Sequence, residues 1–279
     1  MITEGRGAAA AGPGRTPAGA AGNALTGAIA AGDDGVHAET ALLIDAGTVD
    51  VTRSNEGIES ANITIAGGTT SIVSSDDGLN ASGSTTANTG GQNQRGGGGG
   101  GEQVGPYKAT ISGGTLTINA EGDGFDSNGT AEITGGTVVV NGPVTRGNGA
   151  LDVNGSFTIS GGVLLAAGSA GMAVAPGTDS AQGWLSATLT STVAAGTTIH
   201  ITAADGTVLA TFVTTKTVQN IVYSGPNITT GSQYKIYTGG TATGTSIGGL
   251  AQSGTLGSGA AVATVTAGQA PAGTGFGRR

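Results

Sequence analysis

The feature that most constrains this chain is a short phrase that recurs along it: isoleucine, any residue, two small residues, then threonine or valine. The isoleucines are Ile44, Ile65, Ile111, Ile133 and Ile159, so the successive steps are 21, 46, 22 and 26 residues. Short β-branched runs that repeat at such an interval are typical of a solenoid, whose coils stack on one another. The L-x-x-L-x-L frame of leucine-rich repeats is absent, so the sequence predicts a parallel β-helix.

The longest step is about two periods, and its middle is rich in glycine. It contains TANTGGQNQRGGGGGGEQVG at 86–105, a composition typical of a flexible connection rather than of a strand. We therefore expect one coil lengthened by an insertion at 84–106. The paired glycines of the phrase are expected at the corner between the second and third strands of each coil, where a positive φ or a close approach of neighbouring coils excludes a Cβ.

Stacked coils place equivalent residues above one another, about 4.8 Å apart, in ladders that run along the solenoid. The chain has 57 glycines and 3% aromatic residues, which disfavours helices and predicts a core of small and β-branched side chains. The expected fold class is all-β, a right-handed parallel β-helix of about five to six coils. The predicted inward ladders are Val36, Ile58, Leu79, Phe125 and Leu151; Leu42, Ile63, Ala109, Ala131 and Phe157; the five isoleucines; Val49, Thr70, Leu116, Val138 and Leu164; and Val51, Ile72, Ile118, Val140 and Ala166.

The two ends of the chain differ from the repeat. Residues 1–22 are a low-complexity segment, and the β-helix is expected over 23–176. Residues 183–240 read as a small antiparallel module of five strands, with ADGT as a hairpin signal. Because an open solenoid end exposes its core, we expect this module to cap the β-helix near Trp184. Residues 241–279 are expected to be a low-complexity tail with little fixed structure.

Negative charge is concentrated in the solenoid. Residues 31–173 hold fifteen of the eighteen acids and four of the ten basic residues, a net charge of −11, so the rest of the chain is +3. This balance argues against nucleic acid as a partner, and the chain lacks an apolar run long enough to span a membrane. The acids also fall into columns: Asp33, Asn55 and Asp76; Asp34, Glu56, Asp77 and Asp123; and His37, Glu59, Asn80, Asp126 and Asp152.

Stacked carboxylates repel one another, and a calcium ion would offset that repulsion. Calcium takes six to eight oxygen ligands and tolerates loose geometry, whereas the absence of cysteine and the separation of His37 from His200 argue against zinc or copper. The alternative is that Asp-Asp-Gly and Asn-Gly only shape turns. The candidate metal ligands are Asp33, Asp34, Glu56, Glu59, Asp76, Asp77, Asp123, Asp126 and Asp152.

The order of motifs resembles a known family. DDGVHAETALLIDAGTVDVT, GDGFDSNGTAEITGGTVVVNGP and GNGALDVNGSFTISGGVLLAAGSAGMAVAP, followed by GTTIHITAADGTVLATF and YKIYTGG, are similar to the carbohydrate-binding β-helix family of bacterial cell surfaces. The resemblance implies a pectate-lyase-like shape, bound calcium, and binding of cellulose or of acidic sugars such as polygalacturonate without catalysis. The acidic positions it carries over are Asp34, Glu56, Asp77, Asp123, Asp126 and Asp152.

Two other functions stay open at this point. A calcium-dependent polysaccharide lyase would need a basic side chain to remove a proton, and Arg53 or Arg146 could supply it. A structural surface or filament protein would instead pair solenoid ends or edges between copies. The opening MITEGRGAAAAGPGRTP lacks the order of a secretory signal, so the expected extracellular or cell-surface location comes from the resemblance.

Overall fold

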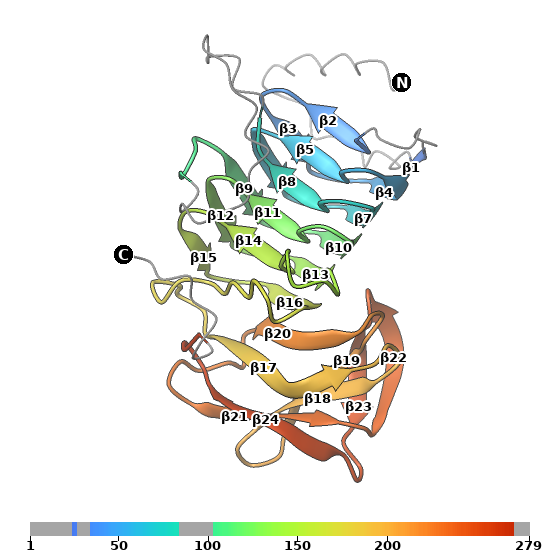
Figure 1. Ribbon diagram of the computed structural model, residues 1–279, viewed down its shortest axis with the longest axis vertical. Coiled ribbons are helices and arrows are strands. Elements are labelled where there is room, and N and C mark those ends of the chain that lie inside the picture. The colour runs from blue at the N-terminus through green and yellow to red at the C-terminus, as the bar shows by residue number, and fades with distance from the viewer. Residues whose placement is uncertain (1–23, 27–33, 84–102, 271–279) are drawn as a thin grey trace, which may run out of the picture.

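The computed structural model describes residues 24–26, 34–83 and 103–270, and these residues form an all-β protein (Figure 1). The predicted segment 1–22 lies outside the described residues, as do most of the insertion at 84–106 and the last residues of the chain. Across the described residues, no helix has the length and hydropathy needed to cross a bilayer.

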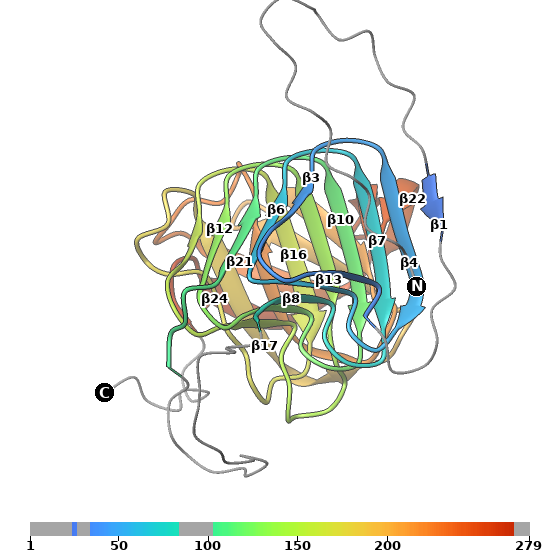
Figure 2. The same ribbon diagram turned by 90° about the horizontal axis from the view of Figure 1, so that it is seen from above.

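Three stacked sheets form the β-helix that the repeat predicts, and their strands alternate along the chain. Figure 2 shows the coils superposed along the axis of the solenoid. Sheet A contains β1 (Ala24–Thr26), β4 (Thr48–Ser54), β7 (Thr69–Ser74), β10 (Thr115–Ala120), β13 (Thr137–Asn141) and β16 (Val163–Gly168) in parallel order. Sheet B contains β2 (Val36–Ala38), β5 (Ile58–Ser60), β8 (Leu79–Ala81), β11 (Phe125–Ser127) and β14 (Leu151–Val153). Sheet C contains β3 (Leu42–Ile44), β6 (Asn62–Ile65), β9 (Lys108–Ile111), β12 (Thr130–Ile133) and β15 (Phe157–Ile159).

The register between coils confirms all five predicted inward ladders. Val36 pairs with Ile58, Leu42 with Ile63, and each later coil continues the same columns. Ile65 lies directly beside Ile111, so the 46-residue step is one coil with an insertion, as predicted. In the later coils Phe125 and Phe157 stack with ring centroids 6.2 Å apart, and Phe157 follows Ala109 and Ala131 in its ladder.

The glycine corner needs both of its glycines, for different reasons. The second glycine has a positive φ in every coil, for example 75° at Gly114 and 81° at Gly136. The first glycine lies under the backbone of the preceding coil, since a Cβ on Gly135 would be 2.4 Å from the carbonyl oxygen of Ser112. A side chain at either position would therefore strain the corner or separate the coils.

The end of the solenoid is capped, as predicted. Sheet A continues past β16 with the antiparallel strands β20 (Val218–Ser224) and β17 (Trp184–Val193). Trp184 is buried against the solenoid core, and its indole N–H donates to the carbonyl of Gly177 at 3.1 Å. The five strands expected between 184 and 238 are all present: β17, β18 (Thr198–Ala203), β19 (Val208–Val213), β20 and β21 (Gln233–Thr238).

The expectation that the low-complexity tail has little fixed structure is wrong for residues 241–266. These residues form β22 (Thr241–Ile247), β23 (Leu250–Thr255) and β24 (Ala260–Thr266), which complete a six-stranded sheet D in the order β22-β23-β19-β18-β21-β24. The many Gly, Ala and Ser residues of this segment carry little strand signal of their own. They form strands here because β19 and β21 offer backbone partners: β23 pairs with β19, β24 pairs with β21, and β22 pairs with β23.

The module, residues 184–266, also covers part of the outer face of sheet A. Val139 and Leu165 point outward from the solenoid yet belong to the module's core. The amide of Asn141 donates to the carbonyl of Gly248 at 3.0 Å and accepts from the hydroxyl of Thr215 at 2.6 Å. The solenoid and the module therefore share one buried interface.

Candidate functional site: an acidic column

The predicted acidic column lies at the corner that leads from sheet A into sheet B. The backbone N–H of Gly35 donates to the carbonyl of Glu56 at 2.8 Å, and Gly57 and Gly78 repeat this bond to the next coil at 2.9 Å. Each glycine is needed because a Cβ would meet the adjacent coil; on Gly57 it would lie 2.2 Å from the carbonyl oxygen of Gly78. The acids that precede these glycines, Asp34, Glu56, Asp77 and Asp123, therefore stack one coil apart.

A second column runs along the outer face of sheet B. His37 pairs with Glu59, Glu59 with Asn80, and Asn80 with Asp126, which pairs in turn with Asp152. This order is the predicted one. Asp126 and Asn80 are buried, and Glu59 and Asp152 are half-buried.

The third predicted column is only partly described. The backbone carbonyl of Asp76 accepts from the N–H of Gly122 at 3.0 Å, and the backbone N–H of Asp76 donates to the carbonyl of Asn55 at 2.9 Å. The three residues are therefore neighbours in successive coils. The side chain of Asp76 faces solvent. Asp33 lies outside the described residues.

Hydrogen bonds from neighbouring coils satisfy several of the carboxylates. Asp77 accepts from the backbone N–H of Asp123 at 2.7 Å, and Asp123 accepts from the N–H of Gly149 at 2.5 Å. Glu56 accepts from the amide of Asn80 at 2.9 Å. These bonds are the turn chemistry that the sequence left open as an alternative to a metal, and they offset part of the repulsion between stacked acids.

At the N-terminal end of the column, a histidine lies between two acids. Nδ1 of His37 is 2.8 Å from Glu59 Oε2 and 3.2 Å from Asp34 Oδ2, and one ligand atom of each residue lies within 4.8 Å of the other two. The sequence places His37 in the ladder above Glu59, and this register is what brings the three side chains together. A protonated imidazole at this position neutralises part of the charge of both carboxylates.

Burial raises the pKa of several acids of the column. Burial is the main cause that raises the pKa of Glu56 to about 7 and that of Asp77 to about 6, and neighbouring carboxylates add to both shifts. Burial also raises the pKa of Asp34. For His37, burial acts against protonation, but the hydrogen bond and charge of Glu59 outweigh it and raise the pKa. The column is therefore partly protonated near neutral pH, and a bound cation would displace those protons.

One buried oxygen in the column lacks a hydrogen-bond partner among the described residues. Oδ1 of Asn80 is shielded from solvent, while the amide nitrogen of the same side chain donates to Glu56. Asn80 stands between Glu59 and Asp126 in the ladder. An unsatisfied acceptor among carboxylates marks a position where a cation would be favourable.

The residues expected to serve other functions are placed less favourably. Trp184 is buried in the cap, so its ring offers no open face for a sugar, and Tyr107 is half-buried with its hydroxyl donating to the carbonyl of Gly83 at 3.0 Å. Arg53 and Arg146 are exposed. The acidic column is thus the best-formed of the predicted sites.

Comparison with known protein families, curated proteins and solved structures yields no match to this chain. The family resemblance therefore stays a prediction.

Proposed function

We propose that this protein is a non-catalytic, extracellular or cell-surface carbohydrate-binding protein that holds calcium at the acidic column and engages an acidic polysaccharide there. The observation that carries the proposal is the buried, unsatisfied Oδ1 of Asn80, a residue whose amide nitrogen donates to Glu56 and whose ladder neighbours are Glu59 and Asp126. Carboxylate and amide oxygens are the hard ligands that calcium prefers, and Glu59 also belongs, with Asp34 and His37, to a group whose ligand atoms lie within 4.8 Å of one another. The resemblance described above points to the same ion and the same class of ligand.

Calcium would also overcome the repulsion between the negatively charged solenoid and an anionic polysaccharide. Uronate polymers are anionic, and a solenoid with a net charge of −11 repels them. A divalent cation held by the column leaves coordination positions for a sugar carboxylate, so it can join two groups of the same sign. Binding of polygalacturonate is therefore expected to require calcium.

The test is a calorimetric titration of calcium into EDTA-treated protein, repeated with Asp77→Asn and Asn80→Leu. We expect heat and a defined stoichiometry for the native chain, weaker binding in both variants, and loss of polygalacturonate binding in EDTA. Asp45→Asn, at an exposed position away from the column, serves as the matched control. Polygalacturonate binding that survives chelation would contradict the proposed mechanism.

The two other functions are distinguishable outcomes of the same experiments. Release of an unsaturated uronate product in calcium, lost in Arg146→Ala, would identify a polysaccharide lyase. Concentration-dependent fibres without affinity for any glycan would favour a structural filament protein.

A further inference from the structure

The module contains one of the two histidines of the chain, and this residue is buried inside it. His200 lies in the middle of β18 and has an exposed fraction of 0%. Its Nδ1 is 2.9 Å from the hydroxyl oxygen of Thr211 on β19. Its Nε2 is shielded from solvent and has no hydrogen-bond partner among the described residues. A buried nitrogen without a partner is uncommon, because an unmade hydrogen bond in the interior costs free energy.

The open end of the β22–β23 hairpin covers this imidazole. A Cβ on Gly240, the residue before β22, would lie 2.6 Å from Nε2 of His200. The same Cβ would overlap the carbonyl oxygens of Thr255 and Leu256, at the end of β23. Gly240 can pass here because it has no side chain and adopts a φ of 77°. The two ends of the hairpin therefore meet against His200.

The hairpin lies at the edge of the module. Among the described strands β22 pairs with β23 alone, and six of its seven residues are exposed. Beyond the pairing of β23 with β19, the turn of the hairpin makes two bonds: Val213 donates its N–H to the carbonyl of Gly249 at 2.9 Å, and Asn141 donates to Gly248. Exposed edge elements of this kind are the ones that open without unfolding of the rest.

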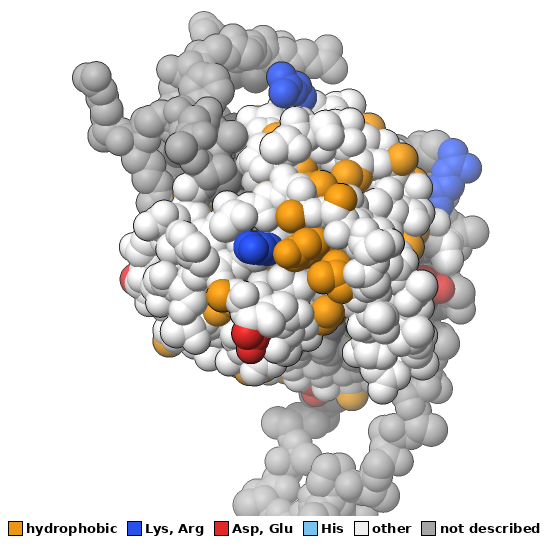
Figure 3. Space-filling view, turned by 90° about the horizontal axis from the view of Figure 1, so that it is seen from below, with side chains coloured by type: hydrophobic (Ala, Val, Ile, Leu, Met, Phe, Trp, Pro, Cys, Tyr) orange, Lys and Arg blue, Asp and Glu red, His pale blue; other side chains and the backbone are white. Residues whose placement is uncertain are grey.

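The strands packed around His200 present no acid to it. Neither β19, β22, β23 nor β24 contains a charged or titratable residue. β21 supplies Tyr237, the strand partner of His200, and Lys235, the partner of Thr202. Asp205 is exposed in the turn after β18. Figure 3, which looks onto the module from below, shows acidic and basic side chains well apart on a mostly uncharged surface. A buried imidazolium would therefore lack a counter-ion.

Burial favours the neutral form of this imidazole. It lowers the pKa of His200, and the backbone of Gly239 acts in the other direction with a smaller effect. The ordinary pKa of imidazole is about 6.5, so a solvent-exposed His200 would be charged in mild acid. Acid therefore favours any state of the module in which His200 reaches solvent.

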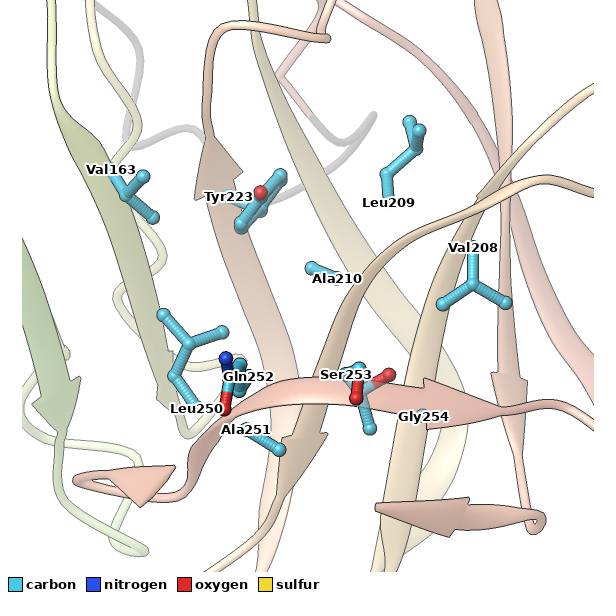
Figure 4. A pocket seen from close by; sticks show the side chains of 11 residues that line it. Val163, Val208, Leu209, Ala210, Tyr223, Leu250, Ala251, Gln252, Ser253 and Gly254 are labelled. Atoms are coloured by element: carbon cyan, nitrogen blue, oxygen red, sulfur yellow. The ribbon is translucent and has the colours of Figure 1, made fainter. Parts of the chain in front are cut away.

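Opening of the hairpin would change two parts of the surface. β23 forms one wall of a cavity of about 270 Å³, and the other walls come from β19 and from Val163 and Tyr223 of sheet A (Figure 4). The turn at Gly248 also packs on Val139, a fully buried residue of β13. Release of the hairpin would remove the wall of the cavity and uncover the outer face of β13.

We propose that His200 is an acid-sensitive latch for the β22–β23 hairpin. While the imidazole is neutral, the hairpin stays closed on β19 and on sheet A. Protonation requires His200 to reach solvent, so the hairpin opens in acid. The acidic column responds with the opposite sign, because Glu56 and Asp77 bind protons in the folded state and acid favours the folded solenoid.

Amide hydrogen exchange in EDTA at about pH 7.5 and about pH 5 tests the latch. The reporter is the N–H of Val213, which donates to Gly249 of the hairpin turn. Its protection factor, which corrects for the intrinsic pH dependence of exchange, should fall by up to about 30-fold, the limit for an imidazole of ordinary pKa that is neutral in the closed state. The N–H of Ile58, which donates to Gly78 within the solenoid at 2.9 Å, should keep its protection.

Two variants assign the response to its residue. His200→Gln keeps a polar side chain beside Thr211 but cannot be protonated, so Val213 should be protected equally at both pH values. His37→Gln is the matched control, since His37 is the other histidine of the chain and is exposed, and it should respond to acid as the native chain does. Unchanged protection in the native chain, or an equal loss in His200→Gln, would overturn the proposal.

The His37→Gln protein decides the question even if His200→Gln does not fold, because its one imidazole belongs to His200. In an NMR titration, the signals of this imidazole should shift below the ordinary pKa of about 6.5 and together with the loss of protection at Val213. An imidazole that titrates near pH 6.5 while Val213 stays protected would show that protonation leaves the hairpin closed, and the latch would be ruled out.

Discussion

At the scale of single residues, the acids of the column have two opposed roles. Each precedes a glycine at a tight corner, where a short polar side chain accepts backbone N–H groups from the next coil. The same stacking buries carboxylates beside one another and raises the pKa of Glu56 and Asp77. Turn geometry therefore explains why acids occur here, and the charge that remains makes the column sensitive to pH and to cations.

Replacing Glu56 with glutamine is expected to flatten the pH dependence of stability. The pKa of Glu56 rises from 4.5 to about 7 in the fold. Between these values the folded protein binds more protons than the unfolded chain, so the free energy of unfolding falls as the pH rises. Because the side chain is only half-buried, solvent screening limits the loss to about 1 kcal/mol. Urea unfolding in EDTA at about pH 5 and about pH 8 measures it.

Asp45→Asn should keep the pH dependence of the native chain, since Asp45 is exposed. An unchanged slope in Glu56→Gln would show that the proton uptake lies elsewhere. Calcium, which favours the ionised column, should stabilise the native chain more at the higher pH than at the lower one.

At the scale of the element, the corner between sheets C and A determines how closely coils can stack. The first glycine of the corner leaves room for the carbonyl of the preceding coil, and the second adopts a positive φ. The isoleucine two residues earlier is buried in every coil. The recurring phrase is therefore one structural unit, with an anchor in the core and a turn that permits the next layer.

Gly135→Ala is expected to destabilise the protein by about 2 to 3 kcal/mol, because its Cβ would overlap the carbonyl of Ser112 and force two coils apart. Gly147→Ala is the matched control, since nothing lies within 4 Å of a Cβ at that position, and its effect should stay within about 0.5 kcal/mol. Thermal and urea unfolding compare the two. Equal stabilities would mean that the coils can separate at little cost.

At the scale of the whole molecule, one module covers both the end and a side of the solenoid. β20 and β17 extend sheet A across the last coil, and sheet D packs on outward residues of β13 and β16. Lys216 reinforces this contact by donating to the carbonyl of Ala120 at 2.6 Å and pairing with Glu121 at 2.9 Å. We therefore expect the solenoid and the module to unfold together.

Asn141→Ala is expected to loosen that interface. The change removes the bonds to Gly248 and Thr215 and should cost about 1 to 3 kcal/mol. It should also speed hydrogen exchange in β22 and β23. Asn119, the ladder neighbour of Asn141, is the control; among the described residues its Oδ1 has no hydrogen-bond partner, so Asn119→Ala should change stability less. Fluorescence of Trp184, the single tryptophan, follows unfolding at the cap.

The sequence by itself determined the β-helix, its register and the stacking of its acids. Each coil repeats the same pattern, and in a parallel stack a residue's place in the repeat decides its neighbours, so Ile65 beside Ile111 or Glu59 beside Asn80 follows from alignment alone.

Only the tertiary structure decided the rest. The strands at 241–266 are rich in Gly, Ala and Ser, and their pairing depends on the edges of β19 and β21. The cavity beside Tyr223 lies where β19 and β23 of sheet D meet β16 and β20 of sheet A, and the burial that raises the pKa of Glu56 comes from surrounding coils. The strands at 241–266 and the cavity depend on contacts between segments that share no repeat, and the burial of Glu56 depends on side-chain packing, which periodicity in the sequence does not encode.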